Sequence, residues 1–329
     1  MTSSTTADAG QGLPGRRSAR PGPSRRRLVR VVLLVAVLVV VAALADLTVL
    51  ARRVDHIDVD LSGGAGDADG RTWVLVGLDS REDLPEGADV ADFGTPTDVP
   101  GARADVVLVV HQTDAGSSVL SVPRDVVVRT GGRPGRLALT WERGPQATVA
   151  ALCSLGIPTD HLVTVDLRGF ADVVDAAGGL DVDVPLPVRD PGAGLELTRQ
   201  GRQHVDGATA LALVRSRHPE HLVDGRWEPA QVDPDGRATA AATALSALVE
   251  ELQGAWLRPW RLQGVAWAGS AAVAVDPDTS FPELAALARS DLGPVQVLPV
   301  GPPANDTIIR FTTPETTAAT AAMGLSCTR

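Results

Sequence analysis

The sequence predicts an α/β fold with a central mixed β-sheet flanked by helices. Short apolar runs at 73–78, 106–110 and 118–122 are bounded by polar, turn-forming residues, as is typical of strands buried on both faces. Further along the chain, strand-like and helix-like segments alternate, which favours a sheet with covering helices over a bundle or a sandwich. A hydrophobic content of 44% in 329 residues is sufficient for a sizeable core.

The N-terminal residues differ from the rest of the chain. Residues 1–27, rich in Ser, Gly, Pro and Arg, predict a disordered basic cytoplasmic tail. Residues 28–51 are almost entirely apolar and form a transmembrane anchor by length, since a helix crosses a bilayer in about 20 residues. Arginines precede the run, which predicts a single-pass membrane protein with an extracytoplasmic body. The alternatives are a cleaved signal peptide ending at Ala43-Leu44-Ala45, and a buried core helix.

Beyond the anchor we expect a linker at 52–71, a main domain at 72–253 and a small C-terminal α/β appendage at 254–329. The appendage shows a strand, helix and strand pattern. After its three strands, the main domain is expected to contain a turn at 133–136, a helix at 145–155, a strand at 162–165, a helix at 168–177 ending at Gly178-Gly179, an edge strand at 181–185, a helix or strand at 208–214, a loop at 218–236 and an alanine-rich helix at 237–252.

The charge distribution excludes one class of partner and leaves another open. Residues 1–53 contain nine arginines and two aspartates, so the rest of the chain is strongly acidic. An acidic body argues against nucleic-acid binding, which needs a basic face. All the basic residues are arginines, so anions would be bound by guanidinium groups. Cys153 and Cys327 lie on the exported side, where a disulfide persists, and they are either paired or free.

Charged residues gather at the ends of the three apolar runs that open the main domain. Strand ends lie at the edge of a sheet, where open α/β folds bind ligands. Charged side chains contribute little to apolar packing, so we expect this group of residues to form a ligand-binding site. The residues are Asp79, Arg81, Arg103, Asp105, Arg124 and Asp125, joined by Arg215 and Arg217 after a later apolar segment.

This set of residues fits a divalent cation and a phosphate group. Mg²⁺ is usually held by one or two carboxylates together with phosphate oxygens, which points to Asp79 and Asp105. Guanidinium groups bind phosphate oxygens bidentately, which suits Arg124, Arg215 and Arg217. The alternative is a solvated salt-bridge network at a sheet edge.

Other site chemistries find little support. The sequence contains no P-loop, no G-x-S-x-G elbow, no C-x-x-C and no G-x-G-x-x-G. The segment 218–221 contains two histidines and a glutamate, but its proline argues against a helical zinc site. The segment 233–236 predicts a turn rather than a calcium loop.

Six short motifs behind the export segment resemble the LytR-CpsA-Psr family of membrane-anchored cell-wall phosphotransferases. The resemblance covers about 73–252 and keeps the family's order. The motifs are Gly77-Leu78-Asp79-Ser80-Arg81, Arg103-Ala104-Asp105, Ser121-Val122-Pro123-Arg124-Asp125, Val165-Asp166-Leu167-Arg168-Gly169-Phe170, Asp175-Ala176-Ala177-Gly178-Gly179-Leu180-Asp181-Val182 and Ala210-Leu211-Ala212-Leu213-Val214-Arg215-Ser216-Arg217.

The resemblance implies that the chain takes a glycopolymer from a polyprenyl-pyrophosphate carrier and joins it to peptidoglycan, with Mg²⁺ as cofactor. The lipid would lie in an apolar tunnel within the domain. Asp79 and Asp105 would bind the metal, while Asp105 and Asp125 are the candidates for the base. Arg124 is also placed among the catalytic residues. The arginines expected to bind the pyrophosphate are Arg81, Arg103, Arg124, Arg215, Arg217 and Arg237.

The chain departs from the family pattern at two places. Where the family usually has Lys-Ile-Asn-x-Ala-Tyr, this chain has Arg-Leu-Ala-Leu-Thr-Trp at 136–141, so the asparagine is missing. The family usually has an Asp three residues before an Arg and then Arg-Gln, whereas Arg237 follows Asp233 and Asp235 and precedes alanines. Alternatives to an active transferase are therefore a catalytically weakened lipid-binding or regulatory protein, a polyprenyl pyrophosphatase and an unrelated structural ectodomain.

Overall fold

The computed structural model describes residues 25–62, 70–80, 101–230, 236–255, 258–305 and 307–327. The chain divides into two compact units, residues 1–48 and 49–329. The described part of the first unit is helical and belongs to α1 (Arg25–Arg53). Within α1, Val29–Arg53 is long and apolar enough to cross a membrane.

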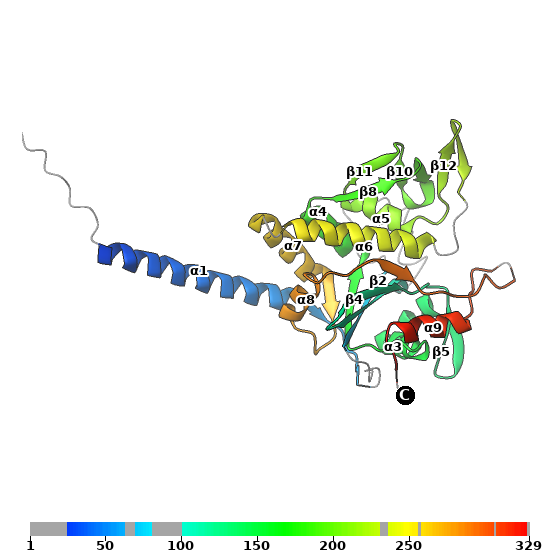
Figure 1. The fold of residues 1–329 in the computed structure, drawn as a ribbon, viewed down its shortest axis with the longest axis horizontal. Coiled ribbons are helices and arrows are strands. Elements are labelled where there is room, and N and C mark those ends of the chain that lie inside the picture. The colour runs from blue at the N-terminus through cyan, green and yellow to red at the C-terminus, as the bar shows by residue number, and fades with distance from the viewer. Residues whose placement is uncertain are drawn as a thin grey trace, which may run out of the picture. The chain divides into compact units, whose positions relative to one another are not determined.

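The centre of the body is a seven-stranded mixed sheet, as expected (Figure 1). In spatial order the strands are β1 (Asp55–His56), β14 (Val273–Val275), β7 (His161–Asp166), β2 (Arg71–Leu78), β3 (Ala104–Thr113), β4 (Gly116–Ser121) and β15 (Val295–Val297). Strands β2, β3 and β4 form an antiparallel meander, whereas β7 runs parallel to β2 and β15 parallel to β4.

One face of this sheet carries the largest apolar core. Val74 and Val76 of β2 point to this side, together with Val107 and Val109 of β3. They pack against α3 (Pro145–Ser154) and α9 (Pro314–Ala322), which lie together on one side of the sheet in Figure 1. The alternating side chains of the strands place the remaining positions on the opposite face.

The opposite face is covered by a layer that contains α4 and α6, and Figure 1 shows α6 running along it. The apolar cluster of this layer draws on helices and on small strands, and none of its described members belongs to the seven-stranded sheet. The elements of the layer are α4 (Leu167–Ala177), α5 (Gly207–Arg215), α6 (Gly236–Ala255), α7 (Pro259–Ala272), β8 (Leu180–Val184), β9 (Val188–Asp190), β10 (Leu195–Leu197), β11 (Gly201–Val205), β12 (Glu220–Val223) and β13 (Arg226–Pro229).

Several local expectations need adjustment. Residues 208–214 are helical in α5, and the segment expected as a loop at 218–236 contains the β12–β13 hairpin. The expected turn at 133–136 is strand β6 (Arg133–Arg136), paired with β5 (Val127–Thr130). The helix at 168–177 does end at Gly178, which adopts the left-handed conformation with φ 94°. The remaining elements are η1 (Leu137–Leu139), η2 (Trp141–Arg143), η3 (Pro191–Ala193) and α8 (Phe281–Leu287).

The segments on either side of the main domain are packed into the same body. From the expected linker, β1 pairs with β14, and Val59 and Leu61 are buried in the main core. The segment 254–329, expected as a small appendage, contributes β14 and β15 to the sheet. A disulfide joins Cys153 of α3 to Cys327 near the C-terminus.

Candidate functional site

The antiparallel meander brings the end of β2, the start of β3 and the end of β4 to one edge of the sheet. Asp79 follows β2 and is 5% exposed, and its backbone N–H donates to the carbonyl of Arg103 at 2.9 Å. Asp105 lies at the start of β3, and Arg124 lies just after β4. The expectation that charged residues at these strand ends share one edge is therefore confirmed.

Asp105 is the centre of the cluster, because two arginines contact the same carboxylate oxygen. Oδ2 of Asp105 forms an ion pair with Nη1 of Arg124 and accepts a hydrogen bond from Nη2 of Arg217 at 3.2 Å. The same Nη2 atom lies 3.9 Å from Oδ2 of Asp79. The Arg124 side chain is only 11% exposed, so its charge is held in a site that excludes much of the water.

A third carboxylate, that of Asp125, extends the cluster to Arg136. Oδ1 of Asp125 lies 3.7 Å from Nε of Arg124 and accepts a hydrogen bond from Nη1 of Arg136 at 3.1 Å. Arg136 ends β6, where the family pattern usually has a lysine. Ala138 takes the position of the family's asparagine; it is fully buried, and its N–H donates to the carbonyl of Arg124 at 2.9 Å. Position 138 therefore supplies no amide side chain to the site.

Among the other expected site residues, the structure describes the side chains of Arg103 and Arg215. The Nε of Arg103 donates to Glu142 at 3.1 Å, a pairing that sequence reasoning missed. Arg215 is partly buried at the end of α5. Arg81 lies outside the described residues, as does the side chain of Arg237, whose backbone belongs to α6.

The loop that carries Arg217 is fixed by Asp190, which the sequence did not single out. Asp190 is 2% exposed, and its Oδ2 accepts hydrogen bonds from the N–H of Arg217 at 2.6 Å, the N–H of His218 at 2.8 Å and the hydroxyl of Ser216 at 2.8 Å. Its Oδ1 accepts from the N–H of Gly192 at 3.1 Å. Burial acts to raise the pKa of Asp190, but these four hydrogen bonds outweigh it and the pKa is lowered.

Helix α5, which precedes this loop, is held from its other end. Asp206 caps it by accepting a hydrogen bond from the N–H of Thr209 at 2.9 Å. The N–H of Gly207 donates to Asp175 of α4 at 2.7 Å. A Cβ atom on Gly207 would lie 2.2 Å from the carbonyl oxygen of Ala171, so only glycine permits this close approach of the two helices.

On the inner face of the sheet, which is the face opposite the largest core, three apolar side chains keep some exposure to solvent. Leu75 of β2, Val106 of β3 and Val165 of β7 are only partly buried, although their strands are central. Ordinary close packing would bury such residues fully. The apolar cluster of the helical layer includes none of the three. Leu75 packs against a third cluster, which contains Trp73 and Val163, so Val106 and Val165 carry most of the apolar surface left available to a ligand.

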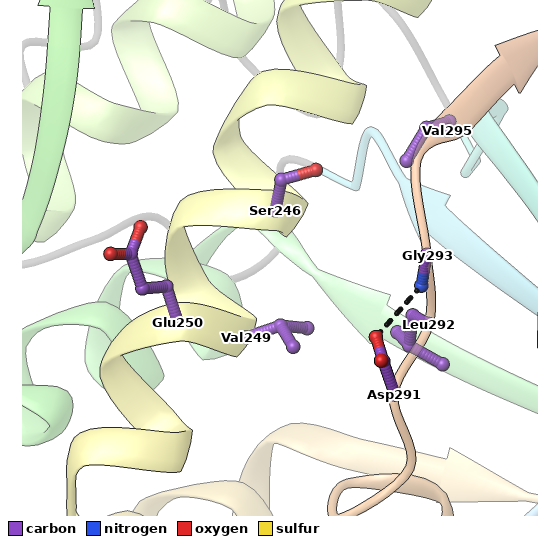
Figure 2. A pocket seen from close by; sticks show the side chains of 7 residues that line it. All are labelled: Ser246, Val249, Glu250, Asp291, Leu292, Gly293 and Val295. Atoms are coloured by element: carbon purple, nitrogen blue, oxygen red, sulfur yellow. Dashed lines mark hydrogen bonds between the residues drawn. The ribbon is translucent and has the colours of Figure 1, made fainter.

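A pocket opens on the same face, farther from the charged cluster. Figure 2 shows Ser246 and Val249 of α6 pointing toward the segment 291–295, whereas Glu250 points away from it. Val295 lies beside Val119 of β4, whereas Arg124 lies beyond the end of β4. The pocket and the charged cluster are therefore separate features of one face.

The donor set at the cluster fits a hard cation in part. Among the described residues, no group of three or more His, Cys, Asp or Glu side chains is arranged to hold a metal ion. Asp79 and Asp105 nevertheless converge on one atom of Arg217, so a cation in its place would meet two carboxylates. Mg²⁺ is often held in this way, with substrate phosphate oxygens completing its coordination.

Comparison with known proteins places this geometry in a family. The chain matches the model described as the LytR_cpsA_psr family over residues 45–227, which is more than half of its length. The chain belongs to the LytR-CpsA-Psr family. The probable cell wall biosynthesis protein LcpB of Corynebacterium glutamicum is 32% identical over 169 residues, which is 50% of this chain and 40% of that protein.

Further family members show the same extent of similarity. TagV of Bacillus subtilis, named a polyisoprenyl-teichoic acid–peptidoglycan teichoic acid transferase, is 31% identical over 145 residues, which is 41% of this chain and 37% of that protein. The matches therefore span well under half of these relatives. The structure of a LytR-Csp2A-Psr enzyme from Actinomyces oris has a TM-score of 0.70 at 35% identity, covering 83% of this chain and 97% of that one. The expected family and fold class are confirmed.

Proposed function

We propose that the chain transfers a glycopolymer from a polyprenyl-pyrophosphate carrier to peptidoglycan. The observation that carries the proposal is the convergence of Arg124 and Arg217 on one oxygen of Asp105, beside Asp79. Guanidinium groups that meet at one anionic oxygen are placed to hold a phosphate in the same way. The names of several relatives, which refer to polyisoprenyl-teichoic acid and peptidoglycan, support this choice of substrate.

In the proposed reaction, a hydroxyl of the acceptor sugar attacks the phosphorus that carries the glycopolymer. A phosphodiester bond forms, the bond to the carrier's other phosphate breaks, and polyprenyl phosphate leaves. Arg124 and Arg217 would neutralise the charge on the phosphate oxygens. The hydroxyl proton would pass to a carboxylate, for which Asp105 and Asp125 are the candidates because both contact Arg124.

Asp79 and Asp105 are the residues that would hold Mg²⁺. When bound, the ion would polarise phosphate oxygens as a Lewis acid. The prenyl chain would lie over the inner face of the sheet, where Leu75, Val106 and Val165 keep exposed apolar surface. This arrangement places the charged end of the carrier at the sheet edge and its apolar chain under the helical layer.

We further propose that α1 anchors the chain in the membrane and that the body lies on the extracytoplasmic side. The basic residues that flank the N-terminal side of the span support this orientation. The Cys153–Cys327 disulfide supports it independently, because structural disulfides are typical of exported domains.

The proposal is tested with the full chain in detergent, supplied with a prenyl-pyrophosphate-linked sugar, Mg²⁺ and peptidoglycan fragments. We expect polyprenyl phosphate to be released together with a new phosphodiester product. Arg124→Ala should reduce the rate by roughly 10²–10³-fold, the usual loss for one charge-stabilising donor. Arg129→Ala, which removes an exposed arginine from β5, is the matched control and should have little effect. Equal rates for Arg124→Ala and wild type would rule the proposal out.

A binding protein with weak turnover is the second candidate, and Ala138 is the observation that favours it. A fully buried alanine stands where the family usually has asparagine, and its N–H donates to the carbonyl of Arg124, so position 138 offers the site no side-chain polar group. Ala138→Asn tests this idea, because it should raise the rate if the missing amide limits turnover. Tight binding of the carrier without product, in wild type and variant alike, would favour the binding role. Release of phosphate without any acceptor would instead indicate hydrolysis.

A further inference from the structure

Helix α7 presents two tryptophans to solvent on one face. Trp260 is 74% exposed, more than any other large apolar side chain among the described residues, and Trp267 is 47% exposed. The exposed positions 260, 263, 267 and 271 recur at helical spacing and form a single stripe. Seven residues make almost two turns, so the two indole rings project from the same side about 10 Å apart along the axis.

The other side of α7 is firmly packed, so this face has a fixed direction. Gly169 of α4 lies so close to Ala272 that a Cβ atom there would be 2.7 Å from the alanine Cβ. Arg261 forms an ion pair with Glu251 of α6 at 3.6 Å. The tryptophan face is therefore the side of α7 that the body leaves uncovered.

Arg53, the last residue of α1, contacts this face directly. Its Nε donates to the hydroxyl of Ser270 at 3.3 Å, and its guanidinium carbon lies 3.9 Å from the centroid of the Trp267 ring. The apolar run Val29–Arg53 extends about 37 Å as a helix, whereas a bilayer core is about 30 Å thick. Arg53 thus lies at the surface where the chain leaves the bilayer, and Trp267 is in contact with it.

The charge around this face also suits a lipid surface. Helix α7 contains no acidic residue, although the whole chain has a net charge of −10. Exposed arginines lie at both ends of the region, Arg52 in the last turn of α1 and Arg258 just before α7. Tryptophan is enriched at membrane–water interfaces, where its ring packs among lipid chains and its N–H meets the headgroups. Basic residues near such a surface are attracted to anionic lipids.

We propose that the tryptophan face of α7, made of Trp260, Gln263, Trp267 and Ala271, inserts into the headgroup region of an anionic bilayer as a second membrane contact beside α1. This inference rests on the proposed function in one respect, which is that α1 is a membrane span. The contact holds the body against the membrane from which the lipid carrier must come. A single flexible tether would not fix that orientation.

The test uses the full chain in liposomes of phosphatidylcholine and phosphatidylglycerol, with and without bromine atoms on the upper part of the acyl chains. Bromine quenches nearby indole fluorescence, so the difference between wild type and Trp260→Phe gives the emission of Trp260 alone. We expect brominated lipid to remove most of this emission. Trp227→Phe, which reports on the β12–β13 hairpin, is the control, and its emission should not change with bromination. Trp260 has no packing role at its exposure, so the variant should melt within about a degree or two of wild type.

Three results would overturn the inference, and they are distinguishable from one another. The first is that the liposomes retain the protein at high pH while Trp260 emits equally in both lipids. In that case α1 spans the membrane, but the tryptophan face does not insert into the headgroup region. If alkaline carbonate releases the full chain, the span itself fails, and with it the premise. If the tryptophan face instead binds a second copy of the chain, light scattering should detect a dimer. Trp260→Phe should then dissociate that dimer, and brominated lipid should not quench Trp260.

Discussion

Replacing Asp190 tests whether one buried carboxylate positions the arginine loop of the site. In Asp190→Asn, the remaining oxygen can still accept from Ser216, Arg217 and His218. The new amide group, however, faces the N–H of Gly192, so one hydrogen bond becomes a contact between two donors. A hydrogen bond to a charged group contributes about 1.5–3 kcal/mol, and we expect a loss of about 2 kcal/mol for this variant. Asp190→Ala removes all four bonds and should cost about 3–5 kcal/mol, since water can reach some of the freed donors.

Urea unfolding of the full chain, followed by tryptophan fluorescence, measures these losses. Turnover of the lipid substrate should fall strongly in Asp190→Ala, which frees Arg217, and less in Asp190→Asn, where the N–H of Arg217 keeps a weaker hydrogen bond to a neutral oxygen. The pH dependence is a separate readout. The pKa of Asp190 is lowered in the folded state, so its stabilisation is complete above its unfolded pKa of about 3.9 and is lost as the pH falls below that value. The stability gap between wild type and Asp190→Asn should therefore narrow in acid.

Asp183→Asn is the matched control, because Asp183 is an exposed carboxylate on β8. It should leave stability and turnover unchanged. The reasoning would be refuted if Asp190→Asn unfolded at the same urea concentration as wild type and turned over substrate at the same rate. It would also fail if the stability gap between the two proteins stayed constant from neutral pH to acid.

Three further predictions follow from packing and charge. The Cys153–Cys327 disulfide closes a sequence separation of 174 residues, for which chain entropy gives at most about 5 kcal/mol, so a double serine variant should unfold about 2–5 kcal/mol more easily in denaturant. Gly207→Ala should destabilise by about 1–3 kcal/mol, seen as a lower melting temperature, because its Cβ atom meets a backbone oxygen of α4 at 2.2 Å. The hydrogen bond with Asp181 raises the pKa of His204, so an NMR titration should place its midpoint above 6.5, and Asp181→Asn should lower it. This pair stabilises the fold below the unfolded pKa of histidine and ceases to do so as the pH rises through the folded pKa.

The sequence predicted the charged edge of the sheet because the information is local. Asp79, Asp105 and Arg124 each adjoin an apolar run, and an antiparallel meander must bring those ends together. The role of Asp190 is different, since three of its four hydrogen-bond partners lie 26 to 28 residues later in the chain. In the sequence, Asp190 precedes a Pro-Gly pair and resembles an ordinary turn residue. Only the pairing of distant elements reveals its function.

The β12–β13 hairpin was missed although its sequence carried a signal. Asp224 and Gly225 join the two strands, and both have positive φ angles, of 50° and 78°. An Asp-Gly pair with this geometry is the favoured two-residue hairpin turn. The positions of β14 and β15 in the sheet could not be predicted from the sequence, for a different reason. Their patterns indicate strands, but pairing at the two sides of a sheet built mainly from earlier residues depends on the tertiary fold.

The shared carboxylate of Asp105 has a consequence for substrate binding. Arg124 and Arg217 both contact it, so a pyrophosphate that takes both arginines deprives Asp105 of two cationic contacts. Leaving a half-buried carboxylate without such contacts is costly. A divalent cation at Asp79 and Asp105 would offset that cost, so pyrophosphate should bind much more weakly in a chelator than with Mg²⁺. In Asp105→Asn the charge is absent, and the two affinities should approach each other. Calorimetry with a short prenyl pyrophosphate measures this, and equal affinities for wild type in chelator and in Mg²⁺ would contradict the argument.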